Sequence, residues 1–246
     1  MLQFKEIQKS HHDISVLIAN NEIIKAINLL IVFASKSKNQ SHHVKIDKIK
    51  DTYHNILKHT FKAVTDPERD KIYSYVQRSL YEINDQIKEC LLTESGELTV
   101  YRMKWALEKK IETHPEEAFT LIKGLTFDNE LEQILKENNI EFPLNDDNSE
   151  NTHTRHDSLK DLFNYLWLTD YYKEIEDKIL ETICYSEKIP WHDKSLVVSA
   201  ITLSLTRVFD QNKFLSLIRF YKQKENQVWQ RALVGIVLNL YKYDKR

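Results

Sequence analysis

The chain has 246 residues, among them only 3 Gly and 4 Pro, and its formal net charge is −2. Folds rich in β-strands and doubly wound α/β folds need many more Gly and Pro residues at their turns, so the composition excludes these classes and predicts an all-α protein. A charge so close to zero is also not the strongly basic footprint of a general nucleic-acid binder.

Cysteine usage and hydropathy predict a cytoplasmic protein without membrane association. The two cysteines, Cys90 and Cys184, form no CxxC pattern, which favours a reducing compartment over a disulfide framework. The N-terminal segment MLQFKEIQKSHH lacks the apolar core of a signal peptide. No uninterrupted apolar run approaches the about 18 residues that a membrane-spanning helix needs.

Residues 1–139 are predicted to form an N-terminal bundle of antiparallel helices. Apolar residues recur at helical spacing in three successive stretches, which are 13–35 with a break at Asn20, 46–64 and 72–91. Asp66 and Pro67 mark the boundary between the last two stretches. Asp is a favourable N-cap residue, and Pro is favourable in the first turn of a helix. Two long amphipathic helices with so short a connector are expected to pack as an antiparallel hairpin. Gly96 then separates this pair from the shorter helices that complete the region.

A polar segment, residues 140–156, divides the N-terminal bundle from a C-terminal helical region, residues 157–246. The segment is rich in Asp and Asn and poor in apolar residues, and we predict that it is a mobile linker. In the C-terminal region, LVVSAITLSLTRVF from Leu196 aligns with VWQRALVGIVLNLY from Val228 at an offset of 32 residues. A helix that Asp210 is expected to cap lies between the two copies. Helix pairs that recur at such an interval are typical of an α-solenoid.

The second copy resembles the second helix of a HEAT-type repeat. In ENQVWQRALVGIVL, the apolar and small positions of that helix are occupied by Val228, Ala232, Gly235 and Ile236. The Arg that usually follows the Val in this family is replaced by Trp229. The resemblance implies a short HEAT-like α-solenoid that follows the N-terminal bundle.

Two further resemblances point to helical-repeat proteins. NNEIIKAINLL, from Asn21, is similar to a tetratricopeptide helix. The segments TDPERDKIYSYVQRSLYEINDQI, FNYLWLTDYY and IPWHDKSLVVSAITLSL resemble parts of a group of large, uncharacterised Bacteroidetes-type helical-repeat proteins. This resemblance implies helical repeats without known catalytic residues, and repeats that continue in a longer native chain. A short natural protein that ends on its own last helix is the alternative.

Three His-Asp dipeptides, which begin at His12, His156 and His192, are the candidate metal ligands of the sequence. All-α metal-dependent phosphohydrolases use such a dipeptide with another His and a distant Asp. Each dipeptide here precedes an apolar helical stretch, however, where Asp is the expected N-cap residue. The motifs GxxxxGK[ST], GxGxxG, HExxH and GxSxG do not occur. We therefore predict no metal, no cofactor and no catalytic residue, and leave open an acid–base pair assembled from distant helices.

The last 40 residues are basic, with nine Lys or Arg against three acidic residues. A basic strip interleaved with aromatic residues can hold phosphates and stack bases. The candidate binding residues are Arg219, Lys222, Lys224, Trp229 and Arg231. The alternative is that the aromatic residues belong to the core and the Lys and Arg residues form a solvated face.

One class of enzyme is comparable in size and build, the HEAT-like DNA alkylation-repair glycosylases. Their chemistry needs aromatic and acidic residues in one basic groove. In this chain, Trp167 with Asp170, or Trp191 with Asp193, have a spacing that allows such a pair.

The leading hypothesis is a non-catalytic helical-repeat scaffold that mediates protein–protein interaction. The 32-residue repeat, the missing catalytic motifs and the near-neutral charge favour it. The alternative is a nucleic-acid-binding HEAT-like protein that uses the basic C-terminal helices. The sequence predicts no oligomeric state.

Overall fold

The computed structural model describes residues 3–60, 68–113, 155–187 and 189–244. Every regular element in these ranges is a helix, which confirms the all-α class. The predicted linker 140–156 lies almost wholly outside the described residues, as do the predicted helices between 114 and 139. The proposed division of the chain at this linker therefore stays a prediction.

The chain forms two compact units, which are described separately. The first comprises Met1–Arg102 with Tyr243–Arg246, and the second comprises Met103–Lys242. The division falls within helix α5 (Thr99–Thr113).

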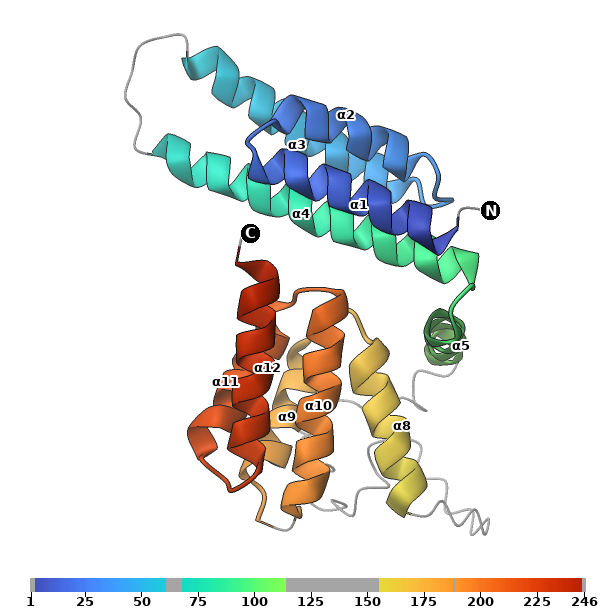
Figure 1. Cartoon of the computed structure of the whole chain (residues 1–246), viewed down its shortest axis with the longest axis vertical. Helices are drawn as coiled ribbons and strands as arrows, with labels where there is room; N and C mark the ends of the chain where they lie inside the picture. The colour runs from blue at the N-terminus through green and yellow to red at the C-terminus, as the bar shows by residue number, and fades with distance from the viewer. Residues whose placement is uncertain (1–2, 61–67, 114–154, 188, 245–246) are drawn as a thin grey trace. The chain divides into compact units, whose positions relative to one another are not determined.

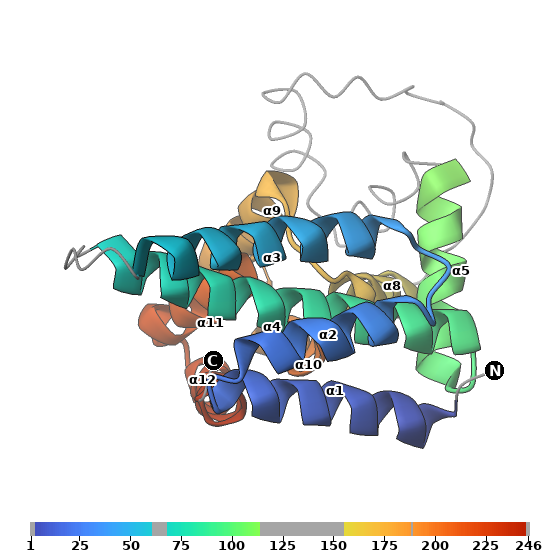
Figure 2. The same cartoon turned by 90° about the horizontal axis from the view of Figure 1, so that it is seen from above.

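Four helices make up the first unit (Figure 1), namely α1 (Phe4–Ala19), α2 (Ile23–Ala34), α3 (Ser41–Thr60) and α4 (Glu68–Ser95). Helix α4 contacts each of the other three, and Figure 2 shows α1, α2 and α3 running alongside it. Helices α3 and α4 are antiparallel, because Lys45 bonds to Gln86 while Tyr53 contacts Tyr73. The expected pairing of these two long helices is therefore present, while residues 61–67 between them lie outside the description.

Aliphatic side chains from all four helices meet in the core of the first unit. Six of those with exposed fractions of 0–1% are Ile14, Ile18, Leu30, Ile46, Leu80 and Ile87. Burying one such side chain stabilises a fold by about 1.5–3 kcal/mol. The apolar residues whose helical spacing predicted these helices are thus the residues that form the core.

Helix ends were predicted with mixed success. Asn20 caps α1 and Asn21 adopts a left-handed φ of 61°, so the expected break is confirmed. Gly96 follows α4 with a φ of 56°. Asp210 caps α11 by accepting a hydrogen bond from the Lys213 amide. The capping role predicted for Asp13 is wrong, because α1 begins nine residues earlier, at Phe4.

The capping role predicted for Asp193 is also wrong. Pro190 occupies the N-cap of α10, so Asp193 is the third helical residue. A carboxylate in the first turn still interacts favourably with the helix dipole. The sequence signal therefore located the helix start to within a few residues but misassigned the cap.

Within residues 155–187 and 189–244, the helices of the second unit form two rows. They are α8 (Arg155–Leu168), α9 (Glu174–Tyr185), α10 (Trp191–Arg207), α11 (Gln211–Gln223) and α12 (Val228–Tyr243). Helix α10 packs beside α8, and α11 packs beside α9 and α10. The other side of α10 contacts α12, so α8, α10 and α12 make one row and α9 and α11 the other (Figure 1).

Helices α10 and α12 approach each other closely at Gly235. A Cβ atom on Gly235 would overlap Thr202 Oγ1 and lie 3.3 Å from both Thr202 Cγ2 and Leu217 Cδ1. Rotation of Thr202 about χ1 would break the hydrogen bond that its hydroxyl donates to Val198 O at 2.8 Å. On the same side of α12, Arg231 Nη1 donates to Ser199 Oγ at 2.9 Å. The missing side chain at position 235 therefore allows this contact.

Substitution of Gly235 tests this close approach. We expect Gly235→Ala to lower the free energy of unfolding by about 1–3 kcal/mol through overpacking, although Ala is the better helix former. All four Trp residues lie in the second unit, so Trp fluorescence during urea denaturation follows that unit.

A Thr202→Ala background supplies the control, because it removes two of the three atoms nearest the new Cβ, the overlapping Thr202 Oγ1 among them. In that background Gly235→Ala should cost little or be stabilising. Equal losses in both backgrounds would contradict the close approach.

Candidate functional site

The five residues predicted to bind nucleic acid do not form one face. Arg219, on α11, donates to both carboxylate oxygens of Asp177 on α9, at 3.1 and 3.3 Å. Arg231, on α12, is held against Ser199 of α10. These two cations are therefore directed toward different neighbouring helices.

The other three candidate residues lie near the turn between α11 and α12. Lys222 and Lys224 are exposed, and Lys224 ends α11 with a left-handed φ of 54°. Trp229 is half-buried and packs edge-on against Tyr221, with the ring centroids 6.3 Å apart. Lys222, Lys224 and Arg231 are thus the exposed cations among the five candidates, and only the two lysines lie near the aromatic pair in the chain.

Neither aromatic–acid pair considered for glycosylase-like chemistry has an available carboxylate. Asp193 is buried, with His192 Nε2 at 3.3 Å from its Oδ1. Asp170 binds two cations, described next. Trp191 packs edge-on against His192, and Trp167 packs against Phe163.

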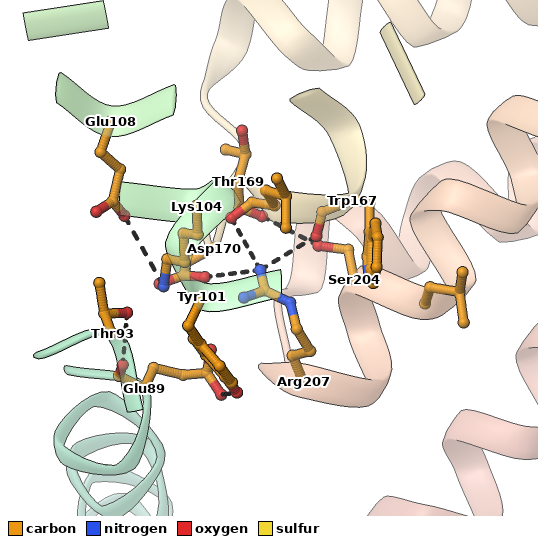
Figure 3. Close-up of polar contacts among 12 residues, drawn as sticks. Glu89, Thr93, Tyr101, Lys104, Glu108, Trp167, Thr169, Asp170, Ser204 and Arg207 are labelled. Carbon is orange, nitrogen blue, oxygen red and sulfur yellow. Dashed lines mark hydrogen bonds and ion pairs between the residues drawn. The ribbon is translucent and has the colours of Figure 1, made fainter. Parts of the chain in front are cut away.

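A cluster of polar side chains in the second unit surrounds Asp170 (Figure 3). We call it the Asp170 cluster, and it consists of Lys104, Thr169, Asp170, Ser204, Arg207 and Lys213. Lys104 Nζ, on α5, lies 2.6 Å from Asp170 Oδ2, and Arg207 Nη2, on α10, lies 2.9 Å from Asp170 Oδ1. Both carboxylate oxygens are therefore bound by cations from different helices.

The cations of this cluster also bind the C-terminal end of α8. Arg207 Nη2 donates to the carbonyl oxygens of Leu168 at 2.8 Å and Trp167 at 3.1 Å. The last carbonyl groups of a helix lack intrahelical partners and carry the negative end of its dipole. A cation placed there donates hydrogen bonds to these carbonyl groups and interacts favourably with the helix dipole.

Lys213 is the most completely buried member, with an exposed fraction of 0%. Its Nζ donates to the carbonyl oxygens of Thr169 and Asp170, at 2.7 and 2.5 Å, and to Ser204 Oγ at 2.8 Å. The same Nζ lies 4.7 Å from the centre of the Tyr172 ring. Burial lowers the pKa of Lys213 to about 7, against the opposing attraction of the nearby carboxylates.

Further hydrogen bonds hold the α8–α9 turn from α11. Asp210 Oδ2 accepts from the Tyr172 amide at 3.1 Å, and Asn212 Nδ2 donates to the Tyr172 carbonyl at 2.8 Å. The Tyr172 hydroxyl donates to Leu166 O at 2.7 Å, and burial raises the pKa of this phenol well above its ordinary value. The turn is thus fixed by side chains from later helices.

The first unit has a polar contact of its own between α1 and α4. Asn84 Nδ2 donates to His11 O at 2.9 Å and to Ser15 Oγ at 3.0 Å. His11 Nε2 lies 2.7 Å from Asp85 Oδ1. The dipeptide that the sequence singled out, His12-Asp13, is exposed.

The cations Arg207 and Lys213 beside Asp170 are bonded to the main chain at or just after the end of α8. A Lys with a lowered pKa is a recognised nucleophile or base, but Lys213 Nζ is fully enclosed and bonded to the main chain. Ion pairs at such depth stabilise little by themselves, whereas removal of one partner typically costs about 3–5 kcal/mol. The chemistry that this cluster supports is fixation of the α8–α9 turn.

Sequence reasoning placed Arg207 and Lys213 among the basic residues of a surface, and this placement is wrong. A signal for Lys213 was present, because it is in helical phase with the buried residues Leu217 and Phe220. No local signal marks Lys104, which meets Asp170 across 66 residues of sequence.

The described residues hold neither a grouped set of metal ligands nor a membrane-spanning helix. Across 3–60, 68–113, 155–187 and 189–244, no three His, Cys, Asp or Glu residues are grouped to hold a metal ion. The side chains of His156 and Asp157 lie outside the description. None of the helices in those ranges is long and apolar enough to cross a membrane.

No protein-family model, curated protein or solved structure matches this chain. The family resemblances of the sequence therefore stay expectations.

The titration of Lys213 predicts a pH-dependent stability. Its pKa is about 7 when folded and has the ordinary value of 10.5 when unfolded. Between these values the unfolded chain binds more protons, so the free energy of unfolding should rise with pH, by up to about 1.4 kcal/mol per pH unit. Burial raises the pKa of Cys184 from 9.0 to about 11, which acts in the opposite sense above pH 9.

The measurement is the free energy of unfolding at pH 7, 8 and 9 by Trp fluorescence. The rise should be absent in Lys213→Met and retained in Lys222→Met, which removes an exposed lysine of the same helix. Parallel pH profiles for wild type and Lys213→Met would show that this lysine titrates normally.

Proposed function

We propose that the chain is a non-catalytic helical scaffold whose second unit is a short HEAT-like α-solenoid that binds another protein. Two features support the solenoid. Successive helices alternate between two rows, with α8, α10 and α12 in one and α9 and α11 in the other. Residues that align at the 32-residue offset, Ser199 and Arg231, are also in contact, as is natural when one repeat stacks on the next.

The observation that carries the binding function is a set of exposed apolar side chains on the outer side of α10 and α12. Leu196 and Leu203 lie seven residues apart on α10 and are 39% and 42% exposed. Val234 and Leu238 lie four residues apart on α12 and are 57% and 51% exposed. By helical periodicity all four point away from α9 and α11. We call these four residues the outer patch.

Apolar side chains gathered on one surface are typical of protein-binding sites. The outer patch lies on two rigid helices fixed to each other at Gly235, which keeps its ordering cost on binding low. The proposal retains the cytoplasmic location and the absence of a cofactor and of membrane association that the sequence predicts.

Charge reversal in the outer patch tests the proposal. We expect Leu203→Glu/Val234→Glu to lose a protein that the wild-type chain retains from nuclease-treated source lysate, because a carboxylate buried in an apolar interface is strongly disfavoured. Quantitative mass spectrometry of the retained proteins is the measurement. Leu215→Glu, at an exposed leucine of α11, is the matched control and should retain the protein.

Two results of the retention experiment would contradict the scaffold proposal. It is wrong if no protein is enriched over background, or if every enriched protein is retained equally by the patch variant.

Nucleic-acid binding is the second candidate function, and the exposed Lys222 and Lys224 beside the Tyr221–Trp229 pair favour it. Cations supply affinity for phosphates and aromatic rings can stack bases. The engagement of Arg219 with Asp177 weakens this candidate relative to the scaffold.

The second candidate predicts a salt-dependent affinity for single-stranded DNA or RNA. Lys222→Glu/Lys224→Glu should weaken binding and reduce the magnitude of the slope of log affinity against log salt by about 1.4, since two phosphate contacts to a single strand are lost. Fluorescence anisotropy with labelled oligonucleotides measures both quantities. Lys160→Glu, at an exposed lysine of α8, is the control, and equal slopes for all three proteins would exclude this site.

A further inference from the structure

Helix α12 has a second apolar face, distinct from the outer patch. Leu233, Val237 and Leu240 lie at spacings of four and three residues and are 37%, 55% and 56% exposed. We call them, together with the 86% exposed Tyr241, the distal face. With about 100° per residue, the centre of this face lies opposite Gly235, the point of contact with α10.

No charge interrupts the distal face. Residues 232–241 contain neither acidic nor basic side chains. The two cations that flank this stretch are turned back toward α10, where Arg231 donates to Ser199 Oγ and Lys242 to Thr206 O. The face is therefore apolar along about three helical turns.

The spacing of the distal face matches a helix–helix contact. Apolar residues that alternate at four and three residues form the seam along which two helices interlock. A helix with an equally apolar, uncharged stripe is the occupant that complements this spacing. The distal face meets this requirement itself.

We propose that the distal face of α12 pairs with the distal face of α12 in a second copy of this chain, in an antiparallel, two-fold symmetric arrangement. In such a pair Val237 lies near the two-fold axis, and Leu233 of each copy meets Leu240 of the other.

Area and net charge are compatible with self-association. The four side chains of the distal face, with exposed fractions of 37–86%, together present several hundred Å² per copy. With the residues at its rim, a pair of such faces reaches the roughly 1,000 Å² that a specific interface needs. A net charge of −2 opposes the approach of two copies only weakly.

The test is the molar mass of the purified full chain by size-exclusion chromatography with light scattering, over a wide range of concentration. The wild type should change from monomer to dimer as concentration rises, and Val237→Glu should raise the dissociation constant at least about 100-fold, because two carboxylates enter one apolar contact. Leu215→Glu introduces the same charge at a comparably exposed leucine of α11 and should leave the dimer unchanged. Circular dichroism confirms that each variant is folded.

Two outcomes would overturn the proposal. They are a wild type that stays monomeric over the whole range of concentration, and a dimer whose dissociation constant is unchanged in Val237→Glu. The measurement uses purified protein alone, so it succeeds or fails independently of the scaffold function.

Disulfide trapping gives a second readout. On a Cys90→Ser background, which removes the more accessible native thiol, Val237→Cys should form a covalent dimer on mild oxidation, because residues near a two-fold axis come within disulfide reach. Leu215→Cys on the same background should not. Equal trapping of both variants would contradict the antiparallel pairing.

Discussion

The second unit depends on the cations that bind the end of α8. Arg207 and Lys213 come from helices that follow α8 by about 40 residues, yet both donate to carbonyl groups at or just after its C-terminus. Those carbonyl groups need partners once they are removed from water. Because α10 and α11 supply the partners, the direction in which the chain leaves α8 is set by tertiary contacts rather than by a local turn motif.

This constraint explains why the two rows of helices are ordered as they are. With the α8–α9 turn fixed from α10 and α11, α9 must lie beside α11 and α8 beside α10. The next step, from α10 to α12, uses a different device, the close approach at Gly235. The polar contacts at the end of α8 and the absence of a side chain at Gly235 thus position α8, α10 and α12, which form one row.

Sequence reasoning predicted the fold class and much of the first unit, because helical periodicity and breaks such as Asn20 and Gly96 are local signals. It also found the cap at Asp210. It did not find the Asp170 cluster, because pairs such as Lys104–Asp170 join residues distant in sequence. Sequence reasoning placed Lys213 on a surface because a count of basic residues does not show in which direction each side chain points. Helical phase with Leu217 would have placed it inside.

The second unit places several of its charges inside and several apolar side chains outside. Arg207 and Lys213 are directed inward, Arg219 is engaged by Asp177, and the middle of α12 has no charge to present. Charged side chains that bond to groups inside the unit do not contribute to its solvent-exposed surface. An apolar helix surface left in water costs free energy that association recovers. This distribution of charge favours binding to protein over binding to phosphate.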